Sequence, residues 1–338
     1  MKFNIFKTST ITDSQNISKY IDKRGIAKFP EDITTIGDEA FSFYWLLEKI
    51  DFSKCDKLKV IGTRAFGNCS SLKEIDLSKC DKLEIIGARA FENCSSLKEI
   101  DLSKCDKLEI IGARAFENCS SLKEIKLPKG ITAIEKCAFD SCKQLEKIDL
   151  SKCDKLEIIE EEAFNCCSSL KEIELPKGIT SIGKRAFYNC EQLEKIDLSK
   201  CDKLEIIEEE AFNCCSSLKE IELPKGITSI GKWAFYNCEQ LEKIDLLKCD
   251  KLEVIDEEAF FYCNSLNDNI LTTIKNIQKK EEEKKKKEQE EKLAAEEEKR
   301  LAAEEEKKRK EKRETRTLII ILLTLWIGIL AFLILREC

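Results

Sequence analysis

An Ala-Phe dipeptide recurs ten times at nearly constant intervals, and this period limits the possible folds more than any other feature of the chain. Neighbouring copies are 23 or 25 residues apart. Repeats of this length are typical of solenoids, in which each repeat forms one coil and packs only against the coils beside it. One coil cannot bury its own apolar face, so we expect about ten coils to stack around a continuous core. The phenylalanines of the ten copies are Phe41, Phe66, Phe91, Phe116, Phe139, Phe164, Phe187, Phe212, Phe235 and Phe260.

Two types of coil account for the two intervals. The longer type reads Leu-x-x-Ile-x-Leu-x-x-Cys-x-x-Leu-x-x-Ile over residues 72–86, and the shorter reads Leu-x-x-Ile-x-Leu-Pro-Lys-Gly-Ile-x-x-Ile over residues 122–134. The alternation of apolar residues predicts a short strand with Ile75 and Leu77 pointing inward. In the Ala-Phe-x-x-Cys-x-x-Leu stretch the apolar residues are three or four apart, which predicts one or two turns of helix on the opposite side.

These repeats resemble the BspA-like class of leucine-rich repeats over roughly residues 30–266. The resemblance is carried by the Leu-x-x-Ile-x-Leu core, the Leu-Pro-x-Gly-Ile-Thr-x-Ile-Gly variant and the Ala-Phe-x-x-Cys-x-x-Leu tail. Residues 180–183 and 228–231 match the end of the variant in full, whereas Glu135 replaces its glycine. The resemblance implies an α/β repeat solenoid of the leucine-rich type. Because the class is known for bacterial and protozoan surface proteins that bind other proteins or host matrix, it also implies a binding function.

Fifteen of the 19 cysteines fall into two periodic sets. We expect both sets to form ladders inside the solenoid, where a buried cysteine behaves as a small apolar residue with a weak donor. The alternative is metal binding or redox chemistry, which the absence of a Cys-x-x-Cys motif disfavours. One set follows the Ala-Phe dipeptide and comprises Cys69, Cys94, Cys119, Cys142, Cys167, Cys190, Cys215, Cys238 and Cys263. The other follows the predicted strand and comprises Cys55, Cys80, Cys105, Cys153, Cys201 and Cys249.

The composition and the near-identity of the coils argue against catalysis. The chain has no histidine, which removes the usual general base and the commonest zinc ligand. Residues 152–199 and 200–247 differ at only two places, Arg185 against Trp233 and Ser199 against Leu247. An active site needs a unique cluster, whereas a copied surface favours extended or multivalent contact. We therefore predict a non-enzymatic binding protein without cofactor or metal. The net charge of −7 gives no support to a nucleic-acid partner.

One outward position in each predicted strand is almost always acidic. The members of this acidic stripe are Asp76, Asp101, Asp149, Glu174, Asp197, Glu222 and Asp245, with Lys126 as the exception. The stripe indicates a basic protein partner, but lysines and glutamates in the adjacent columns also fit a solvated face of interleaved charges. Tyr188, Trp233 and Tyr236 on the other side are candidate aromatic contacts, with packing between coils as the alternative.

The remaining segments divide the chain into further parts. We expect residues 1–30 to form an N-terminal cap, residues 31–266 the solenoid and residues 267–278 a C-terminal capping helix. Residues 279–316 are almost entirely Glu, Lys, Arg and Ala, which predicts a charged helical stalk. Only Leu293 and Leu301 are large and apolar there, so a solitary helix is favoured over a coiled coil.

Residues 318–335 contain no charge, which predicts a single transmembrane helix through a lipid bilayer, followed by a short tail at 336–338. The basic segment 307–316 before it predicts a cytosolic flank. Because the N-terminus lacks a run resembling a signal peptide, we expect a tail-anchored scaffold that displays its repeats to the cytosol. The alternative, from the resemblance, is a cell-surface adhesin or antigen with the solenoid outside.

Overall fold

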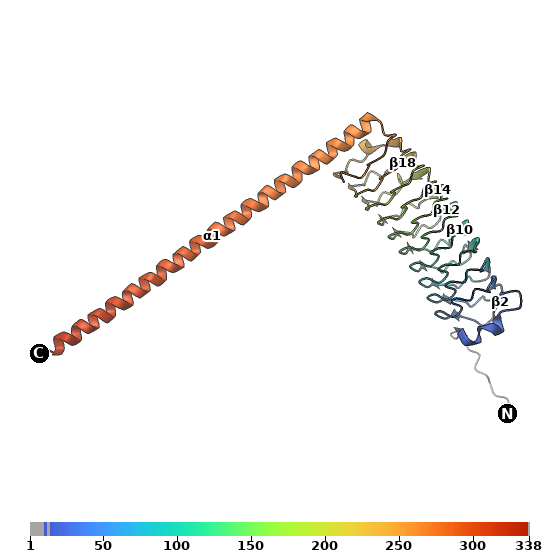
Figure 1. The fold of residues 1–338 in the computed structure, drawn as a ribbon, viewed down its shortest axis with the longest axis horizontal. Coiled ribbons are helices and arrows are strands. Elements are labelled where there is room, and N and C mark those ends of the chain that lie inside the picture. Colours follow the sequence, from blue (N-terminus) through green and yellow to red (C-terminus); the bar gives the residue numbers. More distant parts are fainter. Residues whose placement is uncertain (1–9, 12–13, 337–338) are drawn as a thin grey trace, which may run out of the picture. The chain divides into compact units, whose positions relative to one another are not determined.

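The computed structural model describes the backbone of residues 10–11 and 14–336, and the side chains of these residues except 14–16 and 330–336. The chain divides into two units, residues 1–278 and residues 279–338. The first unit is a parallel β-solenoid of about ten turns (Figure 1). Most coils contribute two short strands, one to a row of strands along each of two sides of the solenoid.

The odd-numbered strands form one parallel sheet of eleven strands, in which every strand pairs with the strand of the next coil. Each strand has two residues. They are β1 (Thr10–Ile11), β3 (Thr35–Ile36), β5 (Val60–Ile61), β7 (Ile85–Ile86), β9 (Ile110–Ile111), β11 (Ala133–Ile134), β13 (Ile158–Ile159), β15 (Ser181–Ile182), β17 (Ile206–Ile207), β19 (Ser229–Ile230) and β21 (Val254–Ile255). The sequence analysis did not predict this sheet.

The even-numbered strands are the predicted ones, and they form two sheets rather than one. The three-stranded sheet contains β2 (Ile26–Lys28), β4 (Lys49–Asp51) and β6 (Glu74–Asp76). The seven-stranded sheet contains β8 (Glu99–Asp101), β10 (Glu124–Lys126), β12 (Lys147–Asp149), β14 (Glu172–Glu174), β16 (Lys195–Asp197), β18 (Glu220–Glu222) and β20 (Lys243–Ile244). Ile75 and Leu77 point inward as predicted, although Ile75 is only partly buried. Two short 3-10 helices, η1 (Ser14–Tyr20) and η2 (Leu246–Lys248), complete the unit.

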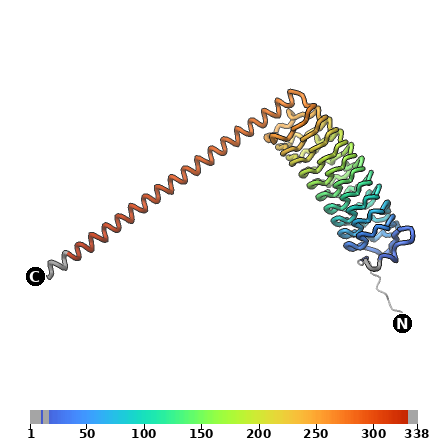
Figure 2. The backbone as a smooth tube through the Cα atoms, viewed as in Figure 1, coloured from blue at the N-terminus to red at the C-terminus, as the bar shows by residue number. Residues whose placement is uncertain are grey.

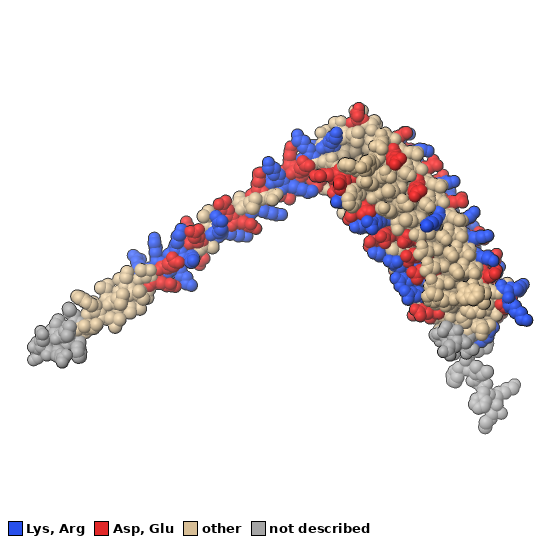
Figure 3. Space-filling view, viewed as in Figure 1, with Lys and Arg blue, Asp and Glu red and all other residues tan. Residues whose placement is uncertain are grey.

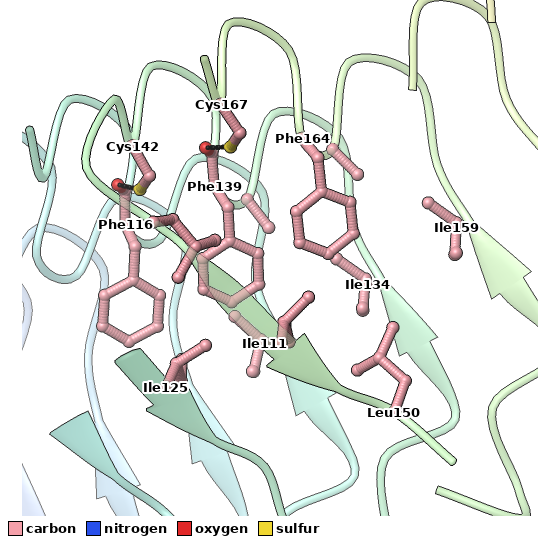
Figure 4. Packing of buried hydrophobic residues seen from close by; sticks show 14 of the residues in the cluster. Ile111, Phe116, Ile125, Ile134, Phe139, Cys142, Leu150, Ile159, Phe164 and Cys167 are labelled. Atoms are coloured by element: carbon pink, nitrogen blue, oxygen red, sulfur yellow. Dashed lines mark hydrogen bonds between the residues drawn. The ribbon is translucent and has the colours of Figure 1, made fainter. Parts of the chain in front are cut away.

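A column of stacked phenylalanine rings fills the centre of the solenoid. The rings of the ten Ala-Phe dipeptides lie 5.1 to 5.4 Å from their neighbours, with interplanar angles of 0° to 16°. Figure 4 shows Phe116, Phe139 and Phe164 side by side, with isoleucines of the strands beneath them. The near-parallel rings mean that successive coils rotate little against one another, which is consistent with the regular row of coils in Figure 2.

The third side of the solenoid consists of turns, and the predicted helical turns there are wrong. In nine of the ten Ala-Phe turns, the residues two before and two after the phenylalanine have positive φ, as at Arg64 (52°) and Asn68 (62°), and in the last turn Tyr262 does. A left-handed residue every fourth position prevents an α-helix. The backbone instead bonds between coils, with the N–H groups of Arg64, Phe66 and Asn68 donating to carbonyls of the next coil at 2.7 to 2.9 Å.

The end segments are more regular than expected. The predicted cap at 1–30 supplies β1 and β2, which pair in register with β3 and β4. At the other end a single helix, α1 (Asp268–Arg336), includes the segments predicted as capping helix, stalk and membrane span. Its charged part carries ion pairs one turn apart, such as Lys308 with Glu304 at 2.9 Å.

The large apolar side chains between Leu318 and Ile329 are 50–65% exposed. Among the residues whose side chains the structure describes, which end at 329, no helix holds a stretch long and apolar enough to cross a membrane. The transmembrane prediction for 318–335 is thus unsupported here, and the side chains of its last six residues, 330–335, lie outside the described residues.

Candidate partner-binding face

The predicted acidic stripe occupies one row along the even-numbered strands. Its residues stand at the last position of these strands or, for Asp245, just after β20. The strand register places them side by side, for example Asp149 beside Glu174 and Asp197 beside Glu222. We call the outward side of these strands the acidic face. Figure 3 nevertheless shows acidic and basic side chains mixed along the coils, which agrees with the interleaved columns in the sequence.

The acidic stripe has aspartate where a serine follows two positions later, and glutamate where a proline does. Asp149 Oδ1 accepts hydrogen bonds from the backbone N–H of Ser151 at 3.0 Å and from its hydroxyl at 2.6 Å. In coils of the shorter type that position is proline, which has no N–H, and the stripe residue is Glu174 or Glu222 instead. The serine bonds hold the pKa of Asp149 below its ordinary value. The aspartates therefore also stabilise the turn after the strand.

Lysines neutralise much of the acidic face in its C-terminal half. Lys147 lies 3.7 Å from Glu172, and Lys195 lies 3.6 Å from Glu220 and 3.2 Å from Glu222. The hydrogen bond that Lys195 donates to Glu222 and the charge of Glu220 raise the pKa of Lys195. These groups are exposed, except for the partly buried Glu220, so each pair stabilises the fold little. Their consequence is electrostatic, because they offset the charges of Glu172, Glu220 and Glu222.

The N-terminal half contains a groove at the break between the two even-stranded sheets. β6 is the edge of one sheet and β8 the edge of the other, and both have the sequence Glu-Ile-Asp. Like charges therefore face each other across the break, where they repel. Ile75 in β6 is partly buried there, whereas Ile100 in β8 is 2% exposed.

This acidic groove has a volume of about 300 Å³. Its charged lining residues are Glu74, Asp76, Glu99, Asp101, Glu124, Lys49 and Lys126. Lys49 bonds Glu74 at 2.6 Å and Lys126 lies 3.9 Å from Asp101, so the two lysines stand at the sides of the groove. The sequence analysis named Asp76 and Asp101 but missed Glu74 and Glu99. Three successive glutamates in one column, at 74, 99 and 124, were the available signal.

The predicted aromatic residues lie on the Ala-Phe turns and are not brought together with the acidic stripe. Tyr188, Trp233 and Tyr236 are all partly buried. Lys232 Nζ lies 4.0 Å from the centre of the Trp233 ring, and the Tyr236 ring packs edge-on against Tyr262 at 5.3 Å. These residues therefore form a separate feature on the third side of the solenoid.

The prediction that the two cysteine sets line the interior is confirmed. Every described cysteine is a free thiol, and all members of both sets are at most 6% exposed. Those after the Ala-Phe dipeptide donate to a phenylalanine carbonyl of the preceding coil, as Cys142 and Cys167 do in Figure 4. Burial raises the pKa of the eight thiols from Cys69 to Cys238 in this set, to about 12 at Cys119. In the described part of the chain, no group of three or more Cys, Asp or Glu side chains is arranged to hold a metal ion.

Comparisons with known proteins agree with the repeat pattern. A family model described as the BspA type leucine rich repeat region matches in six copies, over residues 20–107, 84–203 and 199–282. No curated protein matches the chain at a significant level. Solved structures that resemble it include a leucine-rich repeat protein from Bacteroides ovatus, with 24% identity over 72% of this chain and 82% of that chain and a TM-score of 0.41.

Two further solved structures are similar at comparable levels. A leucine rich cell surface protein from Faecalibacterium prausnitzii is 27% identical over 72% of this chain and 77% of that chain, with a TM-score of 0.36. The pneumococcal vaccine antigen PcpA is 25% identical over 65% of this chain and 57% of that chain, with a TM-score of 0.47. The family model covers residues 20–282, which is well over half of the sequence. The chain therefore belongs to the BspA-type leucine-rich repeat family.

Proposed function

We propose that the chain is a membrane-attached scaffold that binds a basic segment of a partner protein in the acidic groove. The observation that carries this proposal is the excess of carboxylates at the break between β6 and β8, where five acidic side chains and two lysines line the groove. There Glu74, Asp76, Glu99 and Asp101 lie on two adjacent edge strands, with lysines only at the sides. A cationic segment relieves the repulsion between these carboxylates when it binds.

The groove also has an apolar element that suits a lysine or arginine side chain. Ile75 is partly buried beneath the carboxylates, whereas the equivalent isoleucines Ile100 and Ile125 are each 2% exposed. The methylene stem of a lysine or arginine covers apolar surface while its charged end stays among carboxylates. Charge-assisted hydrogen bonds to carboxylates are the stronger kind, which favours guanidinium and ammonium groups over neutral donors.

Binding is favoured over catalysis by the make-up of the coils. The chain has no histidine, and residues 152–199 recur almost unchanged as residues 200–247. A chemical step requires a nucleophile or base held by its own set of orienting groups. Leucine-rich repeats present a long row of similar groups instead, which suits recognition of an extended partner.

We further propose that residues 318–335 attach the chain to a lipid bilayer with the repeats on the cytosolic side. Two observations support this. The 18 residues of the segment carry no charge, and the large apolar side chains up to Ile329 are at least half exposed. Such a surface is stable only when an apolar medium or partner covers it. The basic residues between 307 and 316 favour a cytosolic position for this flank.

Peptide binding to charge variants tests the groove. The full chain is reconstituted in nanodiscs of neutral lipid and titrated by calorimetry with a synthetic peptide of alternating lysine and glycine. The double variant Glu74→Gln with Glu99→Gln should lose about tenfold in affinity, or about 1.4 kcal/mol. The matched control is Glu172→Gln with Glu220→Gln, which removes equal charge from positions of the same column outside the groove and should lose less than about twofold. Equal losses in the two variants would contradict a binding site in the groove.

Protease accessibility tests the display side. In intact cells that express the full chain, added protease should leave the coils uncut and should cut them after selective permeabilisation of the plasma membrane. Cleavage of the coils in intact cells would place them outside and overturn the cytosolic proposal. Release of the whole chain by alkaline carbonate would overturn the membrane attachment.

A further inference from the structure

We propose that two copies of the chain pack against each other through their Ala-Phe turns in an antiparallel dimer. In this arrangement an aromatic cluster on the first coil of one copy contacts an aromatic cluster on the last coil of the other. This interface lies on a different side of the solenoid from the acidic groove, so it does not depend on the proposed function.

The first cluster replaces a polar turn. In coils two to four, the four residues that start two positions after the phenylalanine are Asn-Cys-Ser-Ser, as at residues 68–71. In the first coil they are Phe43, Tyr44, Trp45 and Leu46. The side chains of Phe43, Trp45 and Leu46 are 71%, 64% and 54% exposed. Tyr44 takes the place of the ladder cysteine and packs against the core. Three large, mostly exposed apolar side chains in one turn are a typical sign of an interface.

The second cluster is on the last two coils. Phe261 and Tyr262 are 51% and 53% exposed, and their rings meet edge-on at 5.5 Å. Tyr236 of the preceding coil joins them through its edge contact with Tyr262. Trp233 lies on the same coil as Tyr236, with Lys232 over its ring. Aromatic residues of this kind supply much of the binding energy at protein interfaces.

The two clusters occupy opposite ends of one face. Phe43 and Tyr262 are equivalent residues, each two after the phenylalanine of an Ala-Phe turn and each with φ of 61°. Bonds between successive coils tie all these turns into one row, and the near-parallel phenylalanine rings keep the row straight. The equivalent positions of the eight coils between them are polar or cysteine. They are Asn68, Asn93, Asn118, Ser141, Cys166, Asn189, Cys214 and Asn237.

A second copy is the occupant that fits both clusters at once. Ten coils at about 4.8 Å per step place the clusters about 43 Å apart. An occupant must therefore present apolar groups at the same separation, and another copy of this chain does so.

The charges between the clusters favour the antiparallel orientation. Arg64, Arg89 and Arg114 occupy one column on coils two to four, and a parallel dimer would place each against its own copy. An antiparallel dimer places Arg64 level with Trp233, and like charges in this column then meet only at Arg114 with Arg185 and at Glu39 with Glu258. In a parallel dimer, every charged residue of the column would meet its own copy. Arginine over a tryptophan ring is attractive. The antiparallel arrangement is also closed by a twofold axis, so it does not extend into a fibre.

Sedimentation equilibrium of the full chain in density-matched detergent tests the dimer. The test variant combines Phe43→Asn, Trp45→Ser and Leu46→Ser, which gives the first coil the residues of coils two to four. Asparagine suits the left-handed position, so this variant should fold. We expect a dimer for the unchanged protein and a dimer dissociation constant at least tenfold weaker for the variant. The control Leu247→Ser removes an 80% exposed apolar side chain from the turn after β20 and should leave the dimer unchanged.

Photo-crosslinking determines the orientation. With p-benzoylphenylalanine at position 45, irradiation should join two chains, and mass spectrometry should find the attachment in residues 258–266 of the second copy. A monomeric unchanged protein, a dimer that persists in the triple variant, or attachment to residues 43–46 of the second copy would each overturn the proposal.

Discussion

The thiol of Cys119 donates a hydrogen bond to the backbone carbonyl of Phe91 in the preceding coil, with sulfur and oxygen 3.2 Å apart. The same bond recurs along the solenoid at 3.0 to 3.3 Å. Because the carbonyl lies inside the core, water does not reach it. The cysteine side chain therefore supplies a donor without introducing a strongly polar group, which explains a cysteine at this position in nine of the ten coils.

The bond predicts a stability difference between two cysteines. Cys119→Ala removes one of two donors to the buried Phe91 carbonyl, which keeps the backbone N–H of Cys94 at 3.1 Å, and should lower the free energy of unfolding by about 0.5–1.5 kcal/mol. The control is Cys166, which is only partly buried. Cys166→Ala should change the free energy of unfolding by less than about 0.5 kcal/mol. Urea unfolding of both variants measures the difference, and equal losses would show that the bond to Phe91 contributes nothing.

The buried thiols also predict that stability falls at alkaline pH. Burial raises the pKa of Cys119 to about 12, against an ordinary value of 9.0. Above pH 9 the unfolded chain releases this proton while the folded chain keeps it, so rising pH favours unfolding. The stabilisation is complete below pH 9 and is lost up to pH 12, at about 1.4 kcal/mol per pH unit for this thiol.

Urea midpoints measured at pH 8 and pH 10.5 test this dependence. The ladder contains other thiols with raised pKa values, such as Cys69 and Cys105, both to about 12, so the decrease should exceed that of one group. An unchanged midpoint would mean that the thiols are accessible to solvent in the folded protein.

The acidic stripe should separate into residues that stabilise turns and residues that do not. Asp149→Ala removes the acceptor for Ser151 and should cost about 0.5–2 kcal/mol, the usual effect of losing such a local side-chain cap. Glu174→Ala removes the same charge from the neighbouring strand, but Pro176 has no N–H to lose a partner. In thermal unfolding, the melting temperature of Glu174→Ala should therefore be close to that of the unchanged protein. A larger effect at Glu174 would contradict this role for the aspartates.

The left-handed positions predict an asymmetric response to substitution. Asn118 has φ of 58°, where asparagine and glycine are tolerated and β-branched residues are strained. Asn118→Val should cost about 1–2 kcal/mol, whereas Asn118→Gly should stay within about 0.5 kcal/mol of the unchanged protein. Chemical denaturation of the two variants checks this. Equal effects would mean that the backbone relaxes at this turn without strain.

The stacking of the coils could be predicted from the sequence because the 23- or 25-residue period and the alternation of apolar residues are both visible in the sequence. The inward positions of Ile75 and Leu77 follow directly from them. The two-residue strands, such as β5 (Val60–Ile61), were missed because two residues are too few to show an alternation. The Ala-Phe turns were taken for helix because left-handed residues produce the same spacing of apolar side chains. Asparagine two residues after the phenylalanine, as at Asn68, was the signal against a helix.

The candidate site was less accessible from the sequence. The sequence predicts that Asp76 and Asp101 lie in one row, because they occupy the same position in successive strands. The groove depends in addition on which charged side chains of neighbouring strands face each other. Glu74 and Glu99 matter because like residues face each other at one break in the sheet, and this break is a property of several coils together. Tyr188, Trp233 and Tyr236 are predicted on the side of the Ala-Phe stretch, away from the strands, and the structure places them on the Ala-Phe turns.

Zero-length carbodiimide coupling of the lysine-glycine peptide to the full chain tests the proposed binding groove most directly. This chemistry joins an amine to a carboxylate only where the two are in contact, and mass spectrometry identifies the joined residues. We predict coupling concentrated on Glu74, Asp76, Glu99 and Asp101. Coupling spread evenly over the lysine-paired Glu172 and Glu220, or over the glutamates of α1, would contradict the account.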